Sequence, residues 1–345
     1  MDNAKLEQIL ADRGEPRFRA RQVWAWAARG VRGYDEMTDV PAALRAELEQ
    51  QLPFSSLVLS EEAHSSDGTL KALFATGDSR AVEAVLMRFR DGRRSICVSS
   101  QSGCPLTCSF CATGAMRFAR NLTASEILDQ ALHFRRIEAI DHCVFMGMGE
   151  PMLNLDAVLG ACERLPDLGI THRRTTISTV GWIPGIEKLT DSEMPLRLAL
   201  SLHAADESLR SELMPVNERY PLADVLEACR AFYARKRRRV FVEYVMLAGV
   251  NDRYEQALQL ARALAPAARG PRAPQSIFKV NLIPYNPSDA DGSIDGPARF
   301  EGSSRESIAA FRSALESQGV PVTVRLTRGR DIAAACGQLA ARSAA

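Results

Sequence analysis

The sequence lacks any apolar run that approaches the roughly 20 residues of a membrane-spanning helix. Its first residues, 1–5, show no basic stretch followed by an apolar one, as a secretory signal would. An excess of positive charge is missing too, because 43 lysines and arginines face 42 aspartates and glutamates, for a net charge of +1. We therefore expect a cytoplasmic protein with no membrane partner, in which any nucleic-acid surface is a local feature.

Cysteines, in contrast, are concentrated. The 345-residue chain has eight of them, and three fall within the short stretch 104–111. These three are too close together for a spread disulfide framework, and no second pair follows that would complete the usual zinc pattern. Clustered cysteines in a cytoplasmic chain more often bind metal or take part in chemistry.

Residues 1–75 are predicted to form a small helical domain. Leu6, Ile9 and Leu10 have helical spacing, and two further helical patterns follow around Trp24 and Leu48. Short β-like stretches appear only at 69–74 and 81–87.

From residue 76 to 345, β-branched apolar runs alternate with amphipathic helical patterns. The predicted strands cover 95–99, 142–146, 175–179, 197–202, 240–246, 279–283 and 320–326. The predicted helices cover 124–136, 155–165, 222–235, 254–264 and 304–318, and loops are predicted at 265–276 and 286–303. About six such βα units predict an α/β fold with a parallel sheet, either a partial βα barrel or a doubly wound sheet.

Cys104, Cys108 and Cys111 form a C-x3-C-x2-C motif directly after the first strand of this alternation. Three thiolates in one short loop suit an iron–sulfur cluster with four irons, one of which stays open for a ligand with an amine and a carboxylate. The alternative is a structural zinc site, which needs a fourth protein ligand. The motif at this position resembles the radical S-adenosylmethionine superfamily, and the resemblance implies one 4Fe-4S cluster and S-adenosylmethionine as cofactors.

Polar residues end the following strands, at the edge of a parallel α/β sheet where ligands bind. Gly149 and Glu150 lie in Gly-Met-Gly-Glu-Pro, where glycine lets a ligand approach the backbone and the carboxylate can pair with an ammonium group. The other candidates for S-adenosylmethionine contacts are Ser178, Ser201, Leu202, His203 and Asn286. Taken singly, each is as typical of a turn, a cap or a strand-end hydrogen bond, so their shared location is what favours a cofactor site.

Two more cysteines stand apart from the motif. Cys97 lies seven residues before Cys104, and Cys336 lies in Ala-Cys-Gly-Gln-Leu near the C-terminus. Each alone is typical of a small buried hydrophobic residue, which is also our interpretation of Cys143, Cys162 and Cys229. Together with the cluster motif, however, Cys97 and Cys336 make the chain resemble the RlmN/Cfr family of radical S-adenosylmethionine RNA methyltransferases.

This resemblance covers nearly the full chain. It extends to the segments 19–24, 37–39, 67–71, 82–85, 120–122, 243–244 and 251–252. It implies that residues 1–75 form an accessory RNA-binding domain and that residues 76–345 form the radical S-adenosylmethionine barrel with a catalytic C-terminal cysteine segment.

The resemblance also implies a mechanism with two molecules of S-adenosylmethionine. Cys336 takes a methyl group from the first, and the radical formed from the second removes a hydrogen atom from that methyl. The resulting carbon radical adds to an adenine of the RNA, and Cys97 then resolves the adduct through a transient disulfide with Cys336. Glu83 is implied as a proton acceptor, although a solvent-facing strand residue is an equally good interpretation of its pattern.

The implied substrates are an adenosine of 23S rRNA and, beside the anticodon, one of tRNA, methylated at carbon 2. Methylation at carbon 8, as in the resistance branch of the family, is the first alternative. A radical enzyme with a non-RNA substrate and a zinc-stabilised RNA-binding protein are the others. A flavodoxin-like electron donor and a monomeric enzyme complete the expectation.

Local basic groups are the candidates for contacts to RNA. The densest run is 235–239, and Arg173, Arg174, Arg325, Arg328 and Arg330 are others. A basic run at a helix end is as typical of a solvated surface as of a phosphate site, so the sequence leaves both interpretations open.

Overall fold

The computed structural model describes residues 1–265, 276–287 and 300–340. Within them, ten strands form one mixed sheet in the spatial order β1, β2, β3, β4, β7, β8, β9, β10, β11, β12. Their bounds are β1 (Leu57–His64), β2 (Leu70–Thr76), β3 (Ala81–Arg88), β4 (Arg94–Cys97), β7 (His142–Phe145), β8 (Thr175–Thr179), β9 (Arg197–Ser201), β10 (Val240–Met246), β11 (Phe278–Pro284) and β12 (Val322–Val324). The two-residue strands β5 (Gln101–Ser102) and β6 (Arg120–Asn121) pair with each other.

The strands from β4 to β12 are parallel and lie in chain order. A doubly wound sheet would reverse its strand order at a switch point, and this order never reverses. β4 and β12 are the first and last strands of this parallel series. Cys97 on β4 and Val324 on β12 line the same cavity, which requires the sheet to curve. The prediction of an α/β fold with a partial βα barrel is therefore confirmed.

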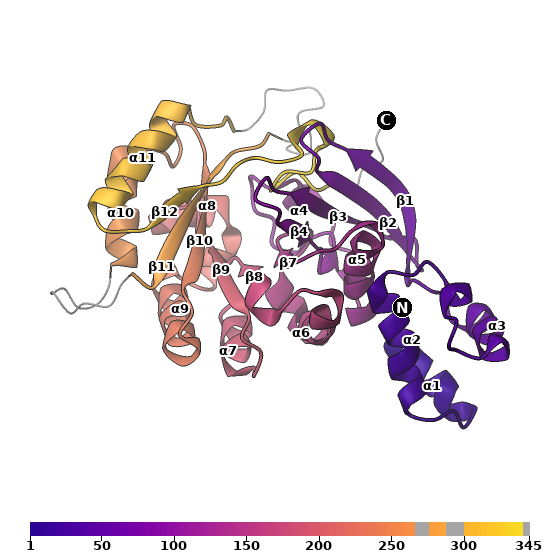
Figure 1. Cartoon of the computed structure of the whole chain (residues 1–345). Helices are drawn as coiled ribbons and strands as arrows, with labels where there is room; N and C mark the ends of the chain where they lie inside the picture. The colour runs from indigo at the N-terminus through magenta and orange to yellow at the C-terminus, as the bar shows by residue number, and fades with distance from the viewer. Residues whose placement is uncertain (266–275, 288–299, 341–345) are drawn as a thin grey trace.

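Helices connect these strands and cover the outside of the barrel (Figure 1). Their bounds are α5 (Ala124–Ile137), α6 (Leu155–Arg164), α7 (Ile183–Asp191), α8 (Glu207–Leu213), α9 (Leu222–Lys236), α10 (Tyr254–Leu264) and α11 (Arg305–Ser317), with a single turn α4 (Ala112–Ala115) after the cysteine motif. The five predicted helices are confirmed, whereas α7 and α8 were not predicted. The predicted loops fall largely on 266–275 and 288–299, outside the described residues.

The N-terminal region is helical only as far as α3. Helices α1 (Asn3–Asp12), α2 (Phe18–Arg29) and α3 (Ala42–Gln51) agree with the prediction, but β1 lies within the stretch that was predicted to be helical. Strand β1 carries a register shift between Leu59 and Glu61, which interrupts the alternation that marks a strand in sequence. Its conformation is instead set by pairing with β2. The division of domains at residue 75 stays a proposal.

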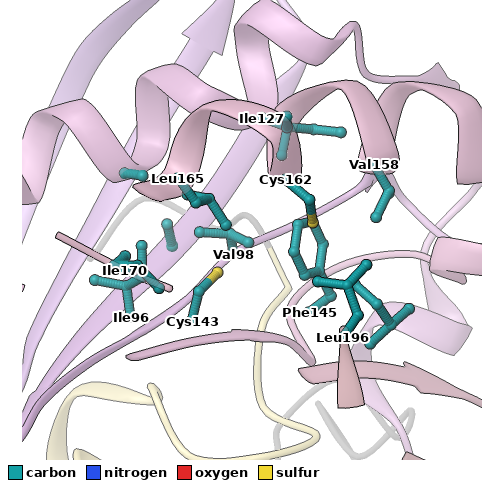
Figure 2. Packing of buried hydrophobic residues seen from close by; sticks show 14 of the residues in the cluster. Ile96, Val98, Ile127, Cys143, Phe145, Val158, Cys162, Leu165, Ile170 and Leu196 are labelled. Atoms are coloured by element: carbon teal, nitrogen blue, oxygen red, sulfur yellow. The ribbon is translucent and has the colours of Figure 1, made fainter. Parts of the chain in front are cut away.

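The core lies between the sheet and these helices. Figure 2 shows Cys143 of β7 and Cys162 of α6 packed among Ile96, Val98 and Phe145. Both thiols and that of Cys229 are fully buried in this apolar cluster, so their interpretation as core residues is confirmed. None of the helices in the described residues has the length and apolar character of a membrane span.

Candidate active site

The cysteine motif forms a tight loop at the carboxyl end of the barrel strands. Glycines allow the loop to fold on itself, because a Cβ at Gly103 would lie 2.4 Å from the Arg117 carbonyl oxygen and one at Gly114 would lie 2.6 Å from that of Cys108. The backbone N–H of Ser109 donates to the Leu213 carbonyl at 3.0 Å, which fastens the loop to α8.

The three thiols of the loop lie close to one another. Burial raises the pKa of Cys104 to about 12, and burial together with the neighbouring Cys111 and Cys104 raises that of Cys108. Among the residues that the structure describes, no three His, Cys, Asp or Glu side chains converge on a single metal ion. A structural zinc site needs such convergence, whereas a four-iron cluster binds each thiolate to a separate iron. Three cysteines in one short loop suit the three thiolate ligands of such a cluster.

The turn after β7 approaches this loop closely. Gly149 has a φ of +94°, and a Cβ there would lie 2.5 Å from the Gln101 Cβ. The Glu150 carboxylate accepts hydrogen bonds from the backbone N–H groups of Met152 at 3.1 Å and Val180 at 3.0 Å, and burial raises its pKa to about 7. The bond from Val180 ties the end of β7 to the end of β8, and the carboxylate can accept a further bond from an ammonium group.

The ends of β8 and β9 add the next predicted residues. The hydroxyl oxygens of Ser178 and Ser201 are 3.5 Å apart, and Leu202 is fully buried. His203 has a φ of +59°, and its Nδ1 accepts a hydrogen bond from the Val245 N–H at 3.0 Å. Burial, with a contribution from Arg210, lowers the pKa of His203 to about 3, so the imidazole is neutral.

A second pair of cysteines, the buried Cys97 and the exposed Cys336, lies apart from the cluster loop. Cys97 and Cys336 both line a cavity of about 410 Å³, together with Asn286. Burial first, and then the neighbouring Cys336, raises the pKa of Cys97 to about 12. All eight cysteines are free thiols, so the transient disulfide remains a proposal.

Cys336 also has a charged neighbour that the sequence did not assign to it. An Arg325 Nη lies 3.8 Å from the Cys336 sulfur and donates toward it. The Arg325 guanidinium pairs with Glu243 at 3.2 Å, and Glu243 accepts a hydrogen bond from Asn281 at 2.8 Å. Burial alone would lower the pKa of Arg325, but Glu243 and Cys336 raise it, so a fixed positive charge lies beside the thiol.

Residues 325–340, here called the C-terminal segment, hold Cys336 at this place. The segment runs from β12 to the turn between β1 and β2 (Figure 1). At the cluster loop, Ala112 N–H donates to the Gly337 carbonyl at 2.8 Å and the Thr113 hydroxyl donates to that of Leu339 at 2.6 Å. Asn286 donates to the Cys336 carbonyl at 3.4 Å.

The β1–β2 turn fastens the other part of the C-terminal segment. Asp331 accepts hydrogen bonds from the Ser65 hydroxyl at 2.6 Å and the Ser66 N–H at 3.1 Å. Asp67 accepts one from the Gly329 N–H at 3.0 Å. The hairpin thus positions a segment more than two hundred residues away in sequence, and no motif in the sequence signals these contacts.

Comparisons with known proteins agree with this arrangement. The model of the radical SAM superfamily matches residues 98–261, and that of the ribosomal RNA large subunit methyltransferase N-terminal domain matches residues 1–53. The probable dual-specificity RNA methyltransferase RlmN of Chloroflexus aurantiacus is 45% identical, over 98% of this chain and 91% of its own. The dual-specificity RNA methyltransferase RlmN of an Anaeromyxobacter species is 43% identical, over 98% and 88%.

This chain belongs to the RlmN family of radical S-adenosylmethionine RNA methyltransferases. A crystal structure of a radical SAM methyltransferase from Sphaerobacter thermophilus is 42% identical, covers 99% of this chain and 98% of its own, and superimposes with a TM-score of 0.90. The family resemblance predicted from sequence is confirmed. Two alternative functions were left open by the sequence: a zinc-stabilised RNA-binding protein and a radical enzyme with a non-RNA substrate. Neither agrees with membership of the RlmN family.

Glu83, for which the family resemblance implied a role as proton acceptor, is almost fully buried. It is therefore not a solvent-facing strand residue. Its carboxylate pairs with Lys71 at 3.0 Å and accepts a hydrogen bond from the Ala340 N–H at 2.9 Å. Among the described residues, the cavity of Cys97 and Cys336 is lined without Glu83, which contacts the C-terminal segment beyond Cys336.

Arg210 is the site residue that the sequence missed altogether. Its guanidinium is fully buried and donates to the carbonyls of Leu202 at 3.3 Å and Val180 at 2.6 Å. Burial lowers its pKa to about 10. Arg210 joins the ends of β8 and β9 next to the predicted S-adenosylmethionine contacts. A single arginine on a short helix does not reveal these bonds in the sequence.

Proposed function

We propose that this enzyme methylates carbon 2 of one adenosine in 23S rRNA and of one in tRNA. The observation that carries the proposal is that Cys97 and Cys336 line one cavity next to the cluster loop. The RNA classes are supported by relatives described as dual-specificity RNA methyltransferases and by the large-subunit rRNA methyltransferase N-terminal domain.

Cys104, Cys108 and Cys111 would hold a 4Fe-4S cluster. The turn of Gly149 and Glu150 and the strand ends carrying Ser178, Ser201, Leu202, His203 and Asn286 would hold S-adenosylmethionine. When bound, these two cofactors supply a methyl group and an organic radical. A radical is needed because carbon 2 of adenine is not nucleophilic, so simple displacement of the methyl group fails there.

Cys336 carries the methyl group to the RNA. A thiolate is the nucleophilic form of cysteine, and an Arg325 Nη donates toward the Cys336 sulfur at 3.8 Å. Asn286 and the contacts of the C-terminal segment keep the sulfur at the cavity.

Cys97 releases the product. Its raised pKa keeps it a thiol, so it stays unreactive until a base takes its proton and its sulfur attacks that of Cys336. Before that attack, the adduct must lose one electron, which the bound cluster would accept, and the proton on carbon 2. When the Cys97 sulfur attacks, the carbon–sulfur bond to the RNA breaks, a disulfide forms, and the released carbon takes up a proton to become the methyl group. Glu83 is our proposed acceptor of the carbon 2 proton, as the family resemblance implies; it contacts the C-terminal segment but does not line the cavity.

Mass spectrometry of nucleosides tests the proposal. RNA from cells that contain the protein should yield 2-methyladenosine in the 23S rRNA and tRNA fractions, and cells without it should lack the signal. Recovery of 8-methyladenosine would replace carbon 2 by carbon 8, and unmodified adenosine in both fractions would refute the function. The flavodoxin-like donor, the monomeric state and the cytoplasmic location stay predictions.

A further inference from the structure

One cavity connects the catalytic cysteines with arginines at the opposite end of the barrel. Besides Cys97 and Cys336, its lining includes Arg174 and Arg197. Arg197 is the first residue of β9, and Arg174 immediately precedes β8. The cluster loop and the predicted S-adenosylmethionine contacts follow the carboxyl ends of the strands, so the arginines mark the amino end.

Strand register places this amino end within reach of the cysteines. Cys97 is in register with Val144, Val144 with Thr176, and Thr176 with Arg197, across four neighbouring strands. Three strand spacings of about 4.8 Å separate the Cα atoms of Cys97 and Arg197 by about 14 Å. A flexible arginine side chain and a nucleotide in the cavity can cover that span.

The positive charges at this end are poorly compensated. Arg174 has one acidic neighbour, Asp141, at 3.8 Å, whereas Arg197 and Arg238 have no ion pair within the described part of the chain. Burial, followed by the neighbouring Arg174, lowers the pKa of Arg197. Burial, followed by Arg173 and Arg197, lowers that of Arg238. Cations that repel one another in this way bind an anion favourably.

Two residues of the basic run 235–239 lie at this end of the barrel, outside the cavity lining. The Lys236 ammonium donates to the carbonyls of Ser192 and Met194, so it fastens α9 to the loop before β9. Arg238 instead lies just before β10, next to Arg197. Strands β8, β9 and β10 are neighbours in the sheet, so Arg174, Arg197 and Arg238 form one cluster from three adjacent strand ends.

We propose that RNA enters the barrel at the amino ends of the strands, opposite the cofactors, and that Arg174, Arg197 and Arg238 bind the phosphates next to the target adenosine. This inference rests on the proposed function and names the part of the chain that holds the RNA. The arginine guanidinium binds phosphate through paired hydrogen bonds. Because such contacts release counterions, they should appear in the salt dependence of RNA binding.

Fluorescence anisotropy under anaerobic conditions tests this with a labelled RNA stem-loop that has an adenosine in its loop. The double variant Arg197→Gln/Arg238→Gln should bind about tenfold more weakly, and its plot of log affinity against log salt should be shallower by about one to two. The double variant Arg197→Lys/Arg238→Lys should recover most of the affinity. Circular dichroism and iron content check that each variant is folded and loaded.

The matched control is Arg312→Gln/Arg305→Gln on the outer helix α11, which removes the same charge far from the cavity. The inference is overturned if the cavity variant binds RNA with the affinity and salt dependence of the wild type, or if the control weakens binding equally. Failure of the proposed function would give a different result. The wild-type enzyme would then bind this RNA through the arginines but would never methylate it, which would refute the function and leave the binding site intact.

Discussion

The two ends of the barrel, where we propose that the cofactors and the RNA bind, differ in their electrostatics. At the carboxyl end, charge is removed by burial, since His203 is neutral and the pKa of Glu150 lies near 7. Arg210 and Arg325 are the exceptions there: Arg210 donates to two backbone carbonyls and to Asn217, and Arg325 pairs with Glu243. At the amino end, Arg197 and Arg238 stay charged and repel one another.

This difference explains how an RNA enzyme can have a net charge of only +1. We infer that the positive charge for RNA gathers locally at the amino-end arginines, whereas the Arg325 guanidinium beside Cys336 is paired with Glu243. Cys97 and Cys336 line the cavity that reaches the amino-end arginines, and in the proposed function Cys336 carries the methyl group. The predictions below test this division.

The largest effect is expected from the two cysteines that join the ends. Cys336→Ala should abolish RNA methylation without trapping RNA, because no sulfur remains to carry the methyl group. Cys97→Ala should also stop turnover but should accumulate enzyme covalently linked to RNA, visible as a shifted band on a denaturing gel. Cys229→Ala, at a buried core position, is the control and should trap none. Normal turnover by Cys97→Ala would remove its resolving role.

A smaller loss is expected when the positive charge beside Cys336 is removed. Arg325→Met should slow methylation of Cys336 by about tenfold or more, since a charge-assisted hydrogen bond of this kind contributes about 1.5–3 kcal/mol. Peptide mass spectrometry of Cys336 in a single turnover measures the rate.

Arg325→Lys should recover part of the methylation rate. The double variant Arg325→Met/Glu243→Gln is the control for the buried Glu243 carboxylate that Arg325→Met leaves unpaired. An unchanged rate in Arg325→Met would leave Arg325 as a merely structural ion pair.

The hairpin contacts to the C-terminal segment should have a several-fold effect. Asp331→Ala removes the bonds to Ser65 and Ser66, so Cys336 should spend less time at the cavity and turnover should fall. Hydrogen exchange of residues 329–336 should become faster, while iron content stays the same. Asp12→Ala, in an exposed turn of α1, is the matched control. Unaltered exchange in Asp331→Ala would show that the hairpin does not position the segment.

The smallest effect concerns stability at acidic pH. The pKa of His203 is lowered to about 3 in the folded protein, below the value of about 6.5 in an unfolded chain. The unfolded state therefore binds the proton first, and stability that is present above pH 6.5 is lost as the pH falls toward 3. Between pH 7 and pH 5 the loss is about 2 kcal/mol.

Asn tolerates the left-handed backbone of residue 203, so His203→Asn should fold and should lose less stability than the wild type between pH 7 and pH 5. Urea unfolding at both pH values measures this difference. His64→Asn, at an exposed position of β1, should behave like the wild type. Equal pH dependence in His203→Asn and the wild type would contradict a buried neutral imidazole.

Local features were predictable from sequence, and features made by distant contacts were not. The cysteine motif and the strands β7 to β11 follow from patterns within a few residues. Strand β1 depends on its partner β2, and the bonds of Arg210 are made with backbone groups on two other strand ends. Arg325 appeared in the sequence only as a basic residue, because its pairing with Glu243 crosses 82 positions.

The account depends most on the claim that the methyl group reaches RNA through Cys336, and a pulse–chase experiment measures that step directly. The enzyme is first incubated with isotope-labelled S-adenosylmethionine and then chased with unlabelled cofactor, reductant and RNA. We expect the label on the Cys336 peptide after the pulse and in 2-methyladenosine after the chase. If Cys336 stays unlabelled while the RNA becomes methylated, the account is contradicted.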